Sequence, residues 1–297
     1  MELHLEWLGL VSSFLWAVAF IVAVIPVNRL GSFAFNRWRM LCSSMILGCA
    51  ALCTGGYGNI SAHQVILMCL SGAVGICIGD VALFACFNRL GPRLSGILFT
   101  THAFFSVAIG MLFFNETLTP ARAAGIFLIF LGVSVTLYFS EEKKKNSTFA
   151  ASSIPVGIAV FLGIFAGLCQ ASGLAIAKPV VEAGISPVAA SSVRMFCAFI
   201  IHMLMLLFFP KRVAAKQPVT LKVFGLVFLN AFIALGLGMT MMLFAVDNGS
   251  IGLAAIFSSC SPVMILPIMW VYYHRRPQLS SWFAAVAVVA GTAVIFS

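Results

Sequence analysis

Ten long apolar runs, separated by short polar connections, constrain the fold of this chain more than any other feature of its sequence. A helix needs about 20 apolar residues to cross the hydrocarbon core of a bilayer, and each run comes close to that length. A soluble domain has about 25% charged residues, whereas 8% of the 297 residues here are charged. We therefore expect lipid to cover most of the outer surface. The ten predicted spans are residues 8–27, 35–54, 64–87, 94–114, 122–139, 154–177, 188–209, 222–246, 251–272 and 281–296.

The second half of the chain repeats short pieces of the first half. The matches, which lie 155 to 160 positions apart, join residues 39–42 to 194–197, residues 83–85 to 243–245, and Gly132 to Gly291. A stable offset indicates a duplicated membrane unit, which many transporter folds contain. Because each unit holds five spans, the second unit must enter the membrane from the opposite side to the first. The two repeats are then inverted.

The sequence therefore predicts an all-α membrane protein with ten transmembrane helices in two inverted five-helix repeats. The first repeat covers residues 1–140 and the second covers residues 154–297. Residues 141–153, which begin with two glutamates and three lysines, form a charged linker between them.

Lys and Arg are distributed unequally over the predicted connections. The connections after odd-numbered spans, with the residues that flank them, hold fourteen of the 17 basic residues, whereas those after even-numbered spans hold Arg122 and Lys178. Basic residues favour the cytoplasmic side of a membrane. We therefore predict an integral, multi-pass protein of the plasma (inner) membrane with both termini outside.

Several functional classes are excluded by what the sequence lacks. The net charge of +9 comes without a basic patch interleaved with aromatic residues, so we predict no nucleic-acid partner. The nine cysteines lie inside apolar runs and form no Cys-x-x-Cys pair, which favours apolar packing over metal binding. Motifs for a phosphate loop, a zinc protease or a serine hydrolase are missing from the sequence. We expect no enzyme activity, no catalytic residues, no metal and no cofactor.

Asp80 is the acidic residue that lies well inside a predicted span. A charge at the bilayer centre costs at least about 2.5–3.5 kcal/mol, so such a residue usually has a partner or faces water. Arg39 lies a few residues into the second span and enters from the same side, which makes an Arg39–Asp80 pair geometrically feasible. Two interpretations stay open: a structural ion pair, or a proton or substrate site.

The repeat gives Arg39 a counterpart but leaves Asp80 without one. Arg39 corresponds to Arg194, whereas Asp80 corresponds to Thr240. An unpaired guanidinium that faces a cavity would favour an anionic or carboxylate-bearing solute. The alternative is that Arg194 extends its charge to the nearby membrane interface. Both arginines are candidates for a charge pair or a gate.

Five further polar or aromatic residues are candidates for solute binding or coupling. Trp16 and Gln170 occupy equivalent places in the first and sixth spans, where an aromatic ring and an amide can contact a solute. His102 lies in the middle of the fourth span, where it acts either as a hydrogen-bonding contact between helices or as a proton relay. Asn230 and Thr240 in the eighth span could face the same cavity.

Glycines in the third span allow close helix packing. Gly75 and Gly79 form a Gly-x-x-x-Gly motif preceded by Gly72, and such small residues let helix backbones approach each other in lipid. The stripe serves either packing within one monomer or the interface of a homodimer.

Short motifs make the chain resemble the drug/metabolite transporter superfamily, specifically its EamA-like ten-helix members. The motifs are residues 115–119 (Asn-Glu-Thr-Leu-Thr) after the fourth span, Gly125 and Gly132-Val133 in the fifth, residues 261–263 (Ser-Pro-Val) in the ninth, and Gly291. The resemblance implies a cavity lined by spans one, three, four, six, eight and nine. It also implies alternating access by rocking of the two halves.

These observations together predict a secondary transporter that moves a small organic metabolite, similar to an amino acid or an organic acid, by alternating access. Its partners would be a small-molecule solute and the membrane lipid, and a proton gradient is one candidate source of energy. One alternative is a carrier of lipid-linked substrates or nucleotide sugars. The other is a membrane scaffold without transport. A polar cavity at the midplane would favour a transporter, and tight packing at the same positions would favour a scaffold.

Overall fold

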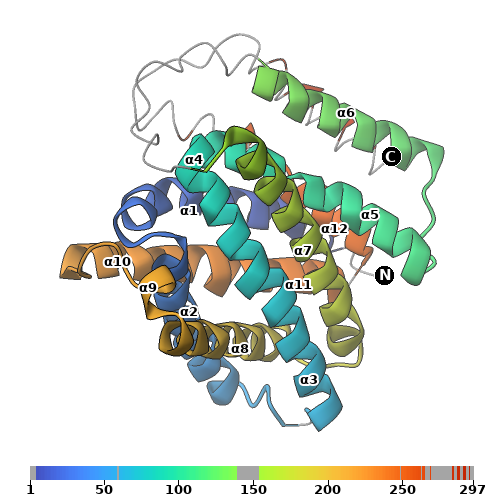
Figure 1. The fold of residues 1–297 in the computed structure, drawn as a ribbon. Coiled ribbons are helices and arrows are strands. Elements are labelled where there is room, and N and C mark those ends of the chain that lie inside the picture. Colours follow the sequence, from blue (N-terminus) through green and yellow to red (C-terminus); the bar gives the residue numbers. More distant parts are fainter. Residues whose placement is uncertain are drawn as a thin grey trace.

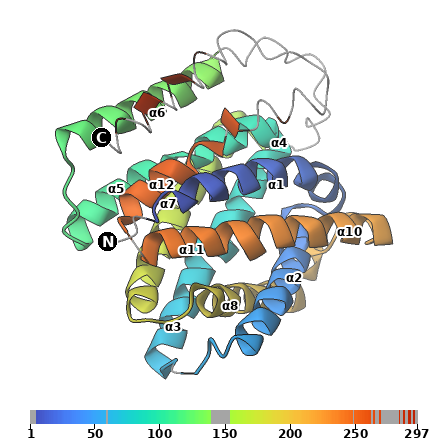
Figure 2. The ribbon, with the colours of Figure 1, turned by 180° about the vertical axis from the view of Figure 1, so that it is seen from behind.

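The fold is given by a computed structural model, which describes residues 5–58, 60–138, 154–247 and 249–261 and a few single residues beyond them. Every regular element in these ranges is a helix (Figures 1 and 2). The elements are α1 (Leu8–Leu30), α2 (Ser32–Cys53), α3 (Ala62–Ser71), η1 (Gly72–Ile78), α4 (Gly79–Phe99), α5 (Thr101–Phe113), α6 (Pro120–Tyr138), α7 (Val156–Glu182), α8 (Pro187–Phe208), α9 (Pro210–Val213), α10 (Leu221–Asn230), η3 (Ala231–Met239), α11 (Thr240–Asp247) and α12 (Ile251–Ser258).

The first eight predicted spans coincide with helical structure. The third span runs from α3 through η1 into α4, and the eighth runs from α10 through η3 into α11. The fourth consists of the end of α4 followed by α5, and α12 begins the ninth. Within the part of the chain that the structure describes, six segments are long and apolar enough to cross a membrane: Leu8–Leu30, Ala62–Gly91, Leu94–Phe113, Val156–Glu182, Pro187–Phe208 and Leu221–Asp247. The protein is therefore an integral, multi-pass membrane protein.

Some predictions fall outside the described residues. The charged linker at 141–153 lies there, as do most of the ninth and tenth spans and the side chains of Arg122, Arg275 and Arg276. The count of ten helices, the inverted repeat and the position of the termini relative to the membrane therefore stay predictions.

Local sequence signals explain where several helices begin and end. Gly31 and Gly91 have φ angles of 80° and 81°, a left-handed conformation that glycine adopts without a steric penalty. They separate α1 from α2 and the third span from the fourth. Ser61 caps α3 with Gln64 in a capping box, and the Thr220 side chain caps α10. Each cap satisfies a backbone N–H group that the first turn leaves free.

Two spans contain π-helical segments at corresponding places, η1 in the third span and η3 in the eighth. Segments with i→i+5 hydrogen bonds are rare and frequently occur at functional sites. Carbonyl groups of η3 accept hydrogen bonds from the side chains of Ser12 (to Gly238, 2.8 Å), Trp16 (to Ala234, 3.1 Å) and Ser43 (to Ala231, 3.2 Å). The hydroxyl and indole groups of neighbouring helices thus hold η3 in the bundle.

Helices from the two halves of the chain pack against one another. In Figures 1 and 2, α2 lies beside α8 and α4 crosses α7, and both pairs are in contact. The α5 helix contacts both α7 and α12, and α1 contacts α10, η3, α11 and α12. The core is therefore shared between the two halves.

The glycine stripe of the third span packs inside the monomer. A side chain at Gly72 would collide with the backbone of Arg194, and a Cβ atom added to Gly173 would lie 2.7 Å from the Cα atom of Gly75. A Cβ atom at Gly79 would lie 3.0 Å from the Cβ atom of Cys169. These glycines bring η1 and the start of α4 into close contact with α7 and α8, which supports the monomer-packing alternative over a dimer face.

Candidate functional site

Polar side chains from both halves of the chain meet at a cavity in the middle of the bundle. The cavity has a volume of about 40 Å³. Its walls come from α1, α2, α4, α7, α10 and η3. The lining residues are Trp16, Ala19, Phe20, Arg39, Asp80, Leu83, Phe84, Phe99, Gln170, Asn230, Ala234, Leu235 and Met239. Five of the predicted site residues are therefore brought together here.

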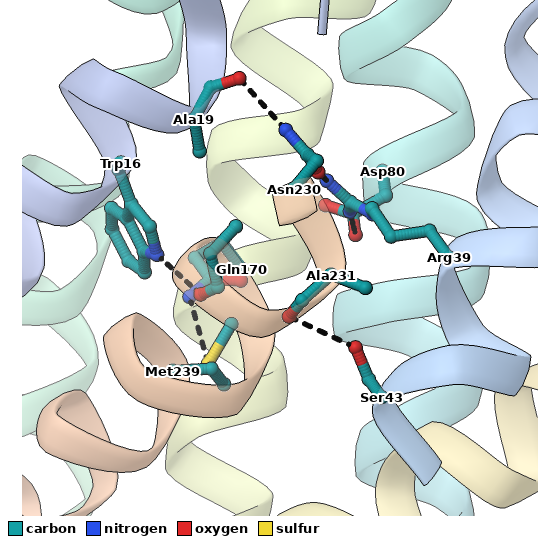
Figure 3. Close-up of polar contacts among 10 residues, drawn as sticks. Trp16, Ala19, Arg39, Ser43, Asp80, Gln170, Asn230, Ala231 and Met239 are labelled. Carbon is teal, nitrogen blue, oxygen red and sulfur yellow. Dashed lines mark hydrogen bonds and ion pairs between the residues drawn. The ribbon is translucent and has the colours of Figure 1, made fainter. Parts of the chain in front are cut away.

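One wall of the cavity is a polar cluster of Arg39, Asp80 and Asn230 (Figure 3). Arg39 forms an ion pair with Asp80 through Nη2, and its Nη1 donates a hydrogen bond of 3.3 Å to Oδ1 of Asn230. The amide nitrogen of Asn230 donates in turn to the carbonyl oxygen of Ala19 at 2.7 Å. The cluster thus joins α1, α2, α4 and α10 through one network.

Aromatic rings surround the guanidinium of Arg39. Its Cζ atom lies 4.8 Å from the ring centre of Phe84 and 5.3 Å from that of Phe35. Cation–π contacts of this kind are worth up to about 2 kcal/mol when desolvated. The two rings, the Asp80 carboxylate and the Asn230 amide therefore together stabilise the buried cation of Arg39.

The opposite wall carries Trp16 and Gln170. The indole N–H of Trp16 donates to the Ala234 carbonyl, and the Gln170 amide lies 3.9 Å from the sulfur of Met239. A thioether is a weak acceptor, so the Gln170 amide is weakly engaged in this conformation. Figure 3 shows both side chains between α1, α7 and η3.

His102 and Thr240 are buried close to the cavity but do not line it. Nδ1 of His102 donates to the carbonyl oxygen of Phe99 at 2.8 Å, and Nε2 hydrogen-bonds the Ser258 hydroxyl at 2.9 Å. Its ring also lies against Trp16, with 6.2 Å between ring centres. Both nitrogens are occupied, which is the pattern expected of a contact between helices. Thr240 follows Met239 and is likewise buried.

Arg194 does not reach the membrane interface. Its side chain is completely buried, at 0% exposure, beside η1. The interface alternative considered for this residue therefore does not describe its position. Arg194 also does not line the cavity in this conformation, although its guanidinium lies beside Gly75, in the same span as Asp80.

Two features of the cavity wall differ from what the family resemblance implied. Arg39 places the second span in the wall, whereas none of the lining residues comes from the described part of the ninth span, which begins with α12. Sequence reasoning also missed the apolar lining side chains, such as Phe20, Phe84 and Met239. An apolar residue inside an apolar span carries no signal that separates a cavity wall from lipid contact.

A second polar network ties Glu116, in the connection after α5, to the start of α12. Its carboxylate accepts hydrogen bonds from the backbone N–H groups of Ile251 (2.8 Å) and Gly252 (3.2 Å). Lys178 of α7 lies 3.8 Å from the same carboxylate and donates to the Gly249 carbonyl at 2.8 Å. A carboxylate at a helix N-terminus is favourable because of the helix dipole. The Glu-containing motif that carried the family resemblance thus has a structural role.

Comparison with known proteins agrees with this architecture. The family model "EamA-like transporter family" matches residues 5–138 and 157–297. The chain is 29% identical over 94 residues to solute carrier family 35 member B1 of Dictyostelium discoideum, and 26% identical over 121 residues to that of Bos taurus. These alignments cover 31% and 38% of this chain but 24% and 35% of the relatives.

The fold itself has a counterpart among solved structures. One structure, described as "Crystal structure of protein", has a TM-score of 0.76 and 14% sequence identity. The match covers 99% of this chain and 96% of the other. The resemblance derived from the sequence motifs is confirmed: this chain belongs to the EamA-like transporter family, within the drug/metabolite transporter superfamily.

Proposed function

We propose that the protein is a secondary transporter that moves a small organic metabolite, similar to an amino acid or an organic acid, by alternating access. The observation that carries the proposal is the cavity at the centre of the bundle. Its walls come from both halves of the chain and hold a carboxylate, a guanidinium, two amides and an indole. A scaffold has no need for a cavity lined by polar groups that are costly to bury in a membrane.

The cavity is small, at about 40 Å³. We therefore infer that the structure represents a contracted state of the transporter. Binding of a metabolite would then require that the two halves separate on one side.

The packing of the helices supports two inverted repeats, 1–140 and 154–297, on either side of the charged linker 141–153. Helices that contact each other have counterparts in the opposite halves that also contact each other. The contact of α4 with α7 corresponds to that of α11 with α1, and the contact of α5 with α7 corresponds to that of α12 with α1. Reciprocal contacts are expected when a two-fold axis relates the halves. With five spans in each half, this axis would lie in the membrane plane and the repeats would be inverted, an arrangement that many transporters use for rocking.

A solute gradient or a proton gradient is the energy source that we propose. No phosphate-loop motif is present in the sequence, so a solute or proton gradient is the expected drive. Asp80 is the group in the cavity wall that would carry a proton. With both termini outside, as the distribution of Lys and Arg suggests, Arg39 and Asp80 would face the cytoplasmic half of the membrane.

A transport assay with the purified full chain in liposomes tests the proposal. The liposomes are loaded with one unlabelled metabolite at a time. The same metabolite, labelled, is added outside, and its uptake into the liposomes is followed. Exchange that saturates with concentration and that falls in Gln170→Leu, but not in Leu229→Ala on the exposed face of α10, supports the proposal. Absence of exchange for amino acids, organic acids and sugars alike would reject it.

One observation favours the alternative of a lipid-linked substrate. A largely apolar groove of about 530 Å³ lies between α2, α3 and α8, and Tyr57, Cys69 and Phe196 contribute to it. A carrier of lipid-linked substrates needs such a lateral groove for the acyl chain. Exchange of a lipid-linked sugar that is lost in a Cys69→Trp variant, with the exchange of soluble metabolites absent, would establish this alternative.

A further inference from the structure

The buried charges around Asp80 do not balance. Asp80 forms an ion pair with Arg39, and the guanidinium of Arg194 lies next to Gly75, in the same span as Asp80. Asp80, Arg39 and Arg194 are 8%, 3% and 0% exposed. Two buried guanidinium groups therefore lie near one buried carboxylate. The set carries one excess positive charge in the membrane interior.

The excess charge belongs to Arg194. Its Nε, Nη1 and Nη2 atoms are all buried, and none of them has a hydrogen-bond partner among the residues that the structure describes. A guanidinium has five N–H donors. A buried charge without a partner is unfavourable, so these donors are available to bind an anionic group.

The surroundings of Arg194 are built to admit its side chain. Gly72 leaves room for the Arg194 backbone, and Nη2 of Arg194 lies 3.5 Å from the position that a Cβ atom on Gly75 would take. Both glycines belong to η1, which leads directly into Asp80. The guanidinium thus occupies space next to the span that carries the cavity carboxylate, close to the cavity but outside its contracted walls.

We propose that Arg194 binds one negatively charged oxygen-bearing group of the transported solute, a carboxylate or a phosphate, when the cavity expands. This inference rests on the proposed transport function and names the chemical class of its substrate. Arg39 is already paired with Asp80 and bonded to Asn230, whereas Arg194 offers a planar fork of donors that matches two oxygens of a carboxylate or phosphate. A monoanionic group would neutralise the excess charge.

Equilibrium binding to the purified wild-type chain in detergent tests the site without any substitution. The probes are sodium lactate, lactamide and sodium phosphate, compared at constant ionic strength, and the readout is the shift of the thermal unfolding midpoint with probe concentration. We expect a saturable rise with lactate or phosphate and none with lactamide, which has the same shape but lacks the charge. The anion that raises the unfolding midpoint at the lower concentration shows whether the site prefers a carboxylate or a phosphate. An equal rise with lactamide, or no rise with either anion, would overturn the proposal.

Variants separate Arg194 from other sources of positive charge. We expect Arg194→Gln to weaken anion binding about 10- to 100-fold, and Arg194→Lys to recover part of it because the charge is kept. Asp80→Asn should strengthen binding because it removes the competing carboxylate. The matched control is Arg37→Gln, which removes another buried arginine whose guanidinium donates to the Val213 carbonyl at 3.3 Å. Wild-type affinity in Arg194→Gln, or equal weakening in Arg37→Gln, would overturn the assignment.

The two proposals fail in different ways. If liposome exchange proceeds equally well for neutral and anionic solutes, the anion site is wrong while the transport function stands. If anions bind through Arg194 but no solute is exchanged, the transport function is wrong while the site stands.

Discussion

The indole N–H of Trp16 reaches across the bundle to the carbonyl oxygen of Ala234, at 3.1 Å, and so joins α1 to the π-helical segment of the eighth span. The same indole lies against Gly238, where a Cβ atom would be 2.8 Å from its nitrogen. One side chain therefore forms part of the cavity wall and fixes the position of η3 at the same time.

Trp16→Phe should separate these two roles. An aromatic ring of smaller size is kept, but the Ala234 carbonyl loses its donor, so we expect a loss of about 1–3 kcal/mol in unfolding free energy. Thermal unfolding in detergent measures this. Trp38→Phe is the control, because Trp38 packs edge-on against Phe224 at 5.8 Å and lies outside the cavity wall. Equal losses in both variants would contradict a specific role for the indole N–H.

The Arg39–Asp80 pair should behave as one unit. Asp80→Asn removes the buried countercharge of Arg39 and should destabilise the fold by about 3–5 kcal/mol, whereas the double variant Arg39→Met/Asp80→Leu should recover most of that loss. Unfolding of the wild type, Arg39→Met, Asp80→Leu and the double variant, which together form a double-mutant cycle, gives the coupling. Strictly additive losses would show that the pair contributes nothing as a pair.

The same substitutions decide whether Asp80 takes part in transport. If it carries a proton, uptake by Asp80→Asn should lose its dependence on the pH gradient, and the stabilised double variant should not restore that dependence. Uptake measured at several pH values makes the comparison. Unchanged uptake with unchanged pH dependence in Asp80→Asn would leave the carboxylate a structural role only.

Close packing of α7 on η1 should be sensitive to a single methyl group. Gly173→Ala places a Cβ atom 2.7 Å from the Gly75 Cα atom, so we expect a loss of about 1–3 kcal/mol from overpacking. Gly157→Ala in the same helix is the control, because a Cβ atom there meets nothing within 4 Å and alanine favours helices. Unfolding should shift in opposite directions for the two variants, and a shared direction would contradict this packing.

Glu116 should stabilise α12 through its N-terminus. Glu116→Gln weakens the interaction with the helix dipole and with Lys178, and a loss of about 0.5–2 kcal/mol is expected. Glu182→Gln serves as the control because its side chain is 45% exposed and exposed ion pairs contribute little. Similar unfolding curves for both variants would argue against the role assigned to Glu116.

The orientation in the membrane can be checked with a fusion reporter at the C-terminus. The distribution of Lys and Arg predicts that the reporter lies outside the cytoplasm. An enzyme that is active only after export should therefore be active in this fusion. Activity of a reporter restricted to the cytoplasm would reverse the assignment and would place Asp80 in the outer half of the membrane.

The sequence identified the hydrophilic part of the cavity because polar groups are conspicuous in an apolar span. Arg39, Asp80, Gln170, Asn230 and Trp16 all line it. The cost of burying such groups in lipid leaves few positions where they are tolerated, so their places in the spans carried most of the information.

The π-helical segments and the burial of Arg194 could not be predicted from the sequence. The π-helical segments η1 and η3 consist of apolar residues and glycines that also suit an α-helix, so the sequence favoured uninterrupted spans. The complete burial of Arg194 depends on room left by Gly72 and Gly75 in a different helix. A contact of that kind arises only from tertiary packing, which single-span reasoning does not include.

The π-helical segment η1 also determines which way the carboxylate of Asp80 faces. Ser71 and Asp80 bracket η1 and lie nine residues apart, which is about two and a half turns of a regular α-helix. With regular winding the two side chains would leave the span in opposite directions. A π-helix turns less per residue than an α-helix, so the winding of residues 72–78 changes that angle. Asp80 pairs with Arg39 of α2, and the Ser71 hydroxyl donates to the Gly173 carbonyl of α7 at 2.5 Å. Residues that do not line the cavity thus set the direction of its carboxylate.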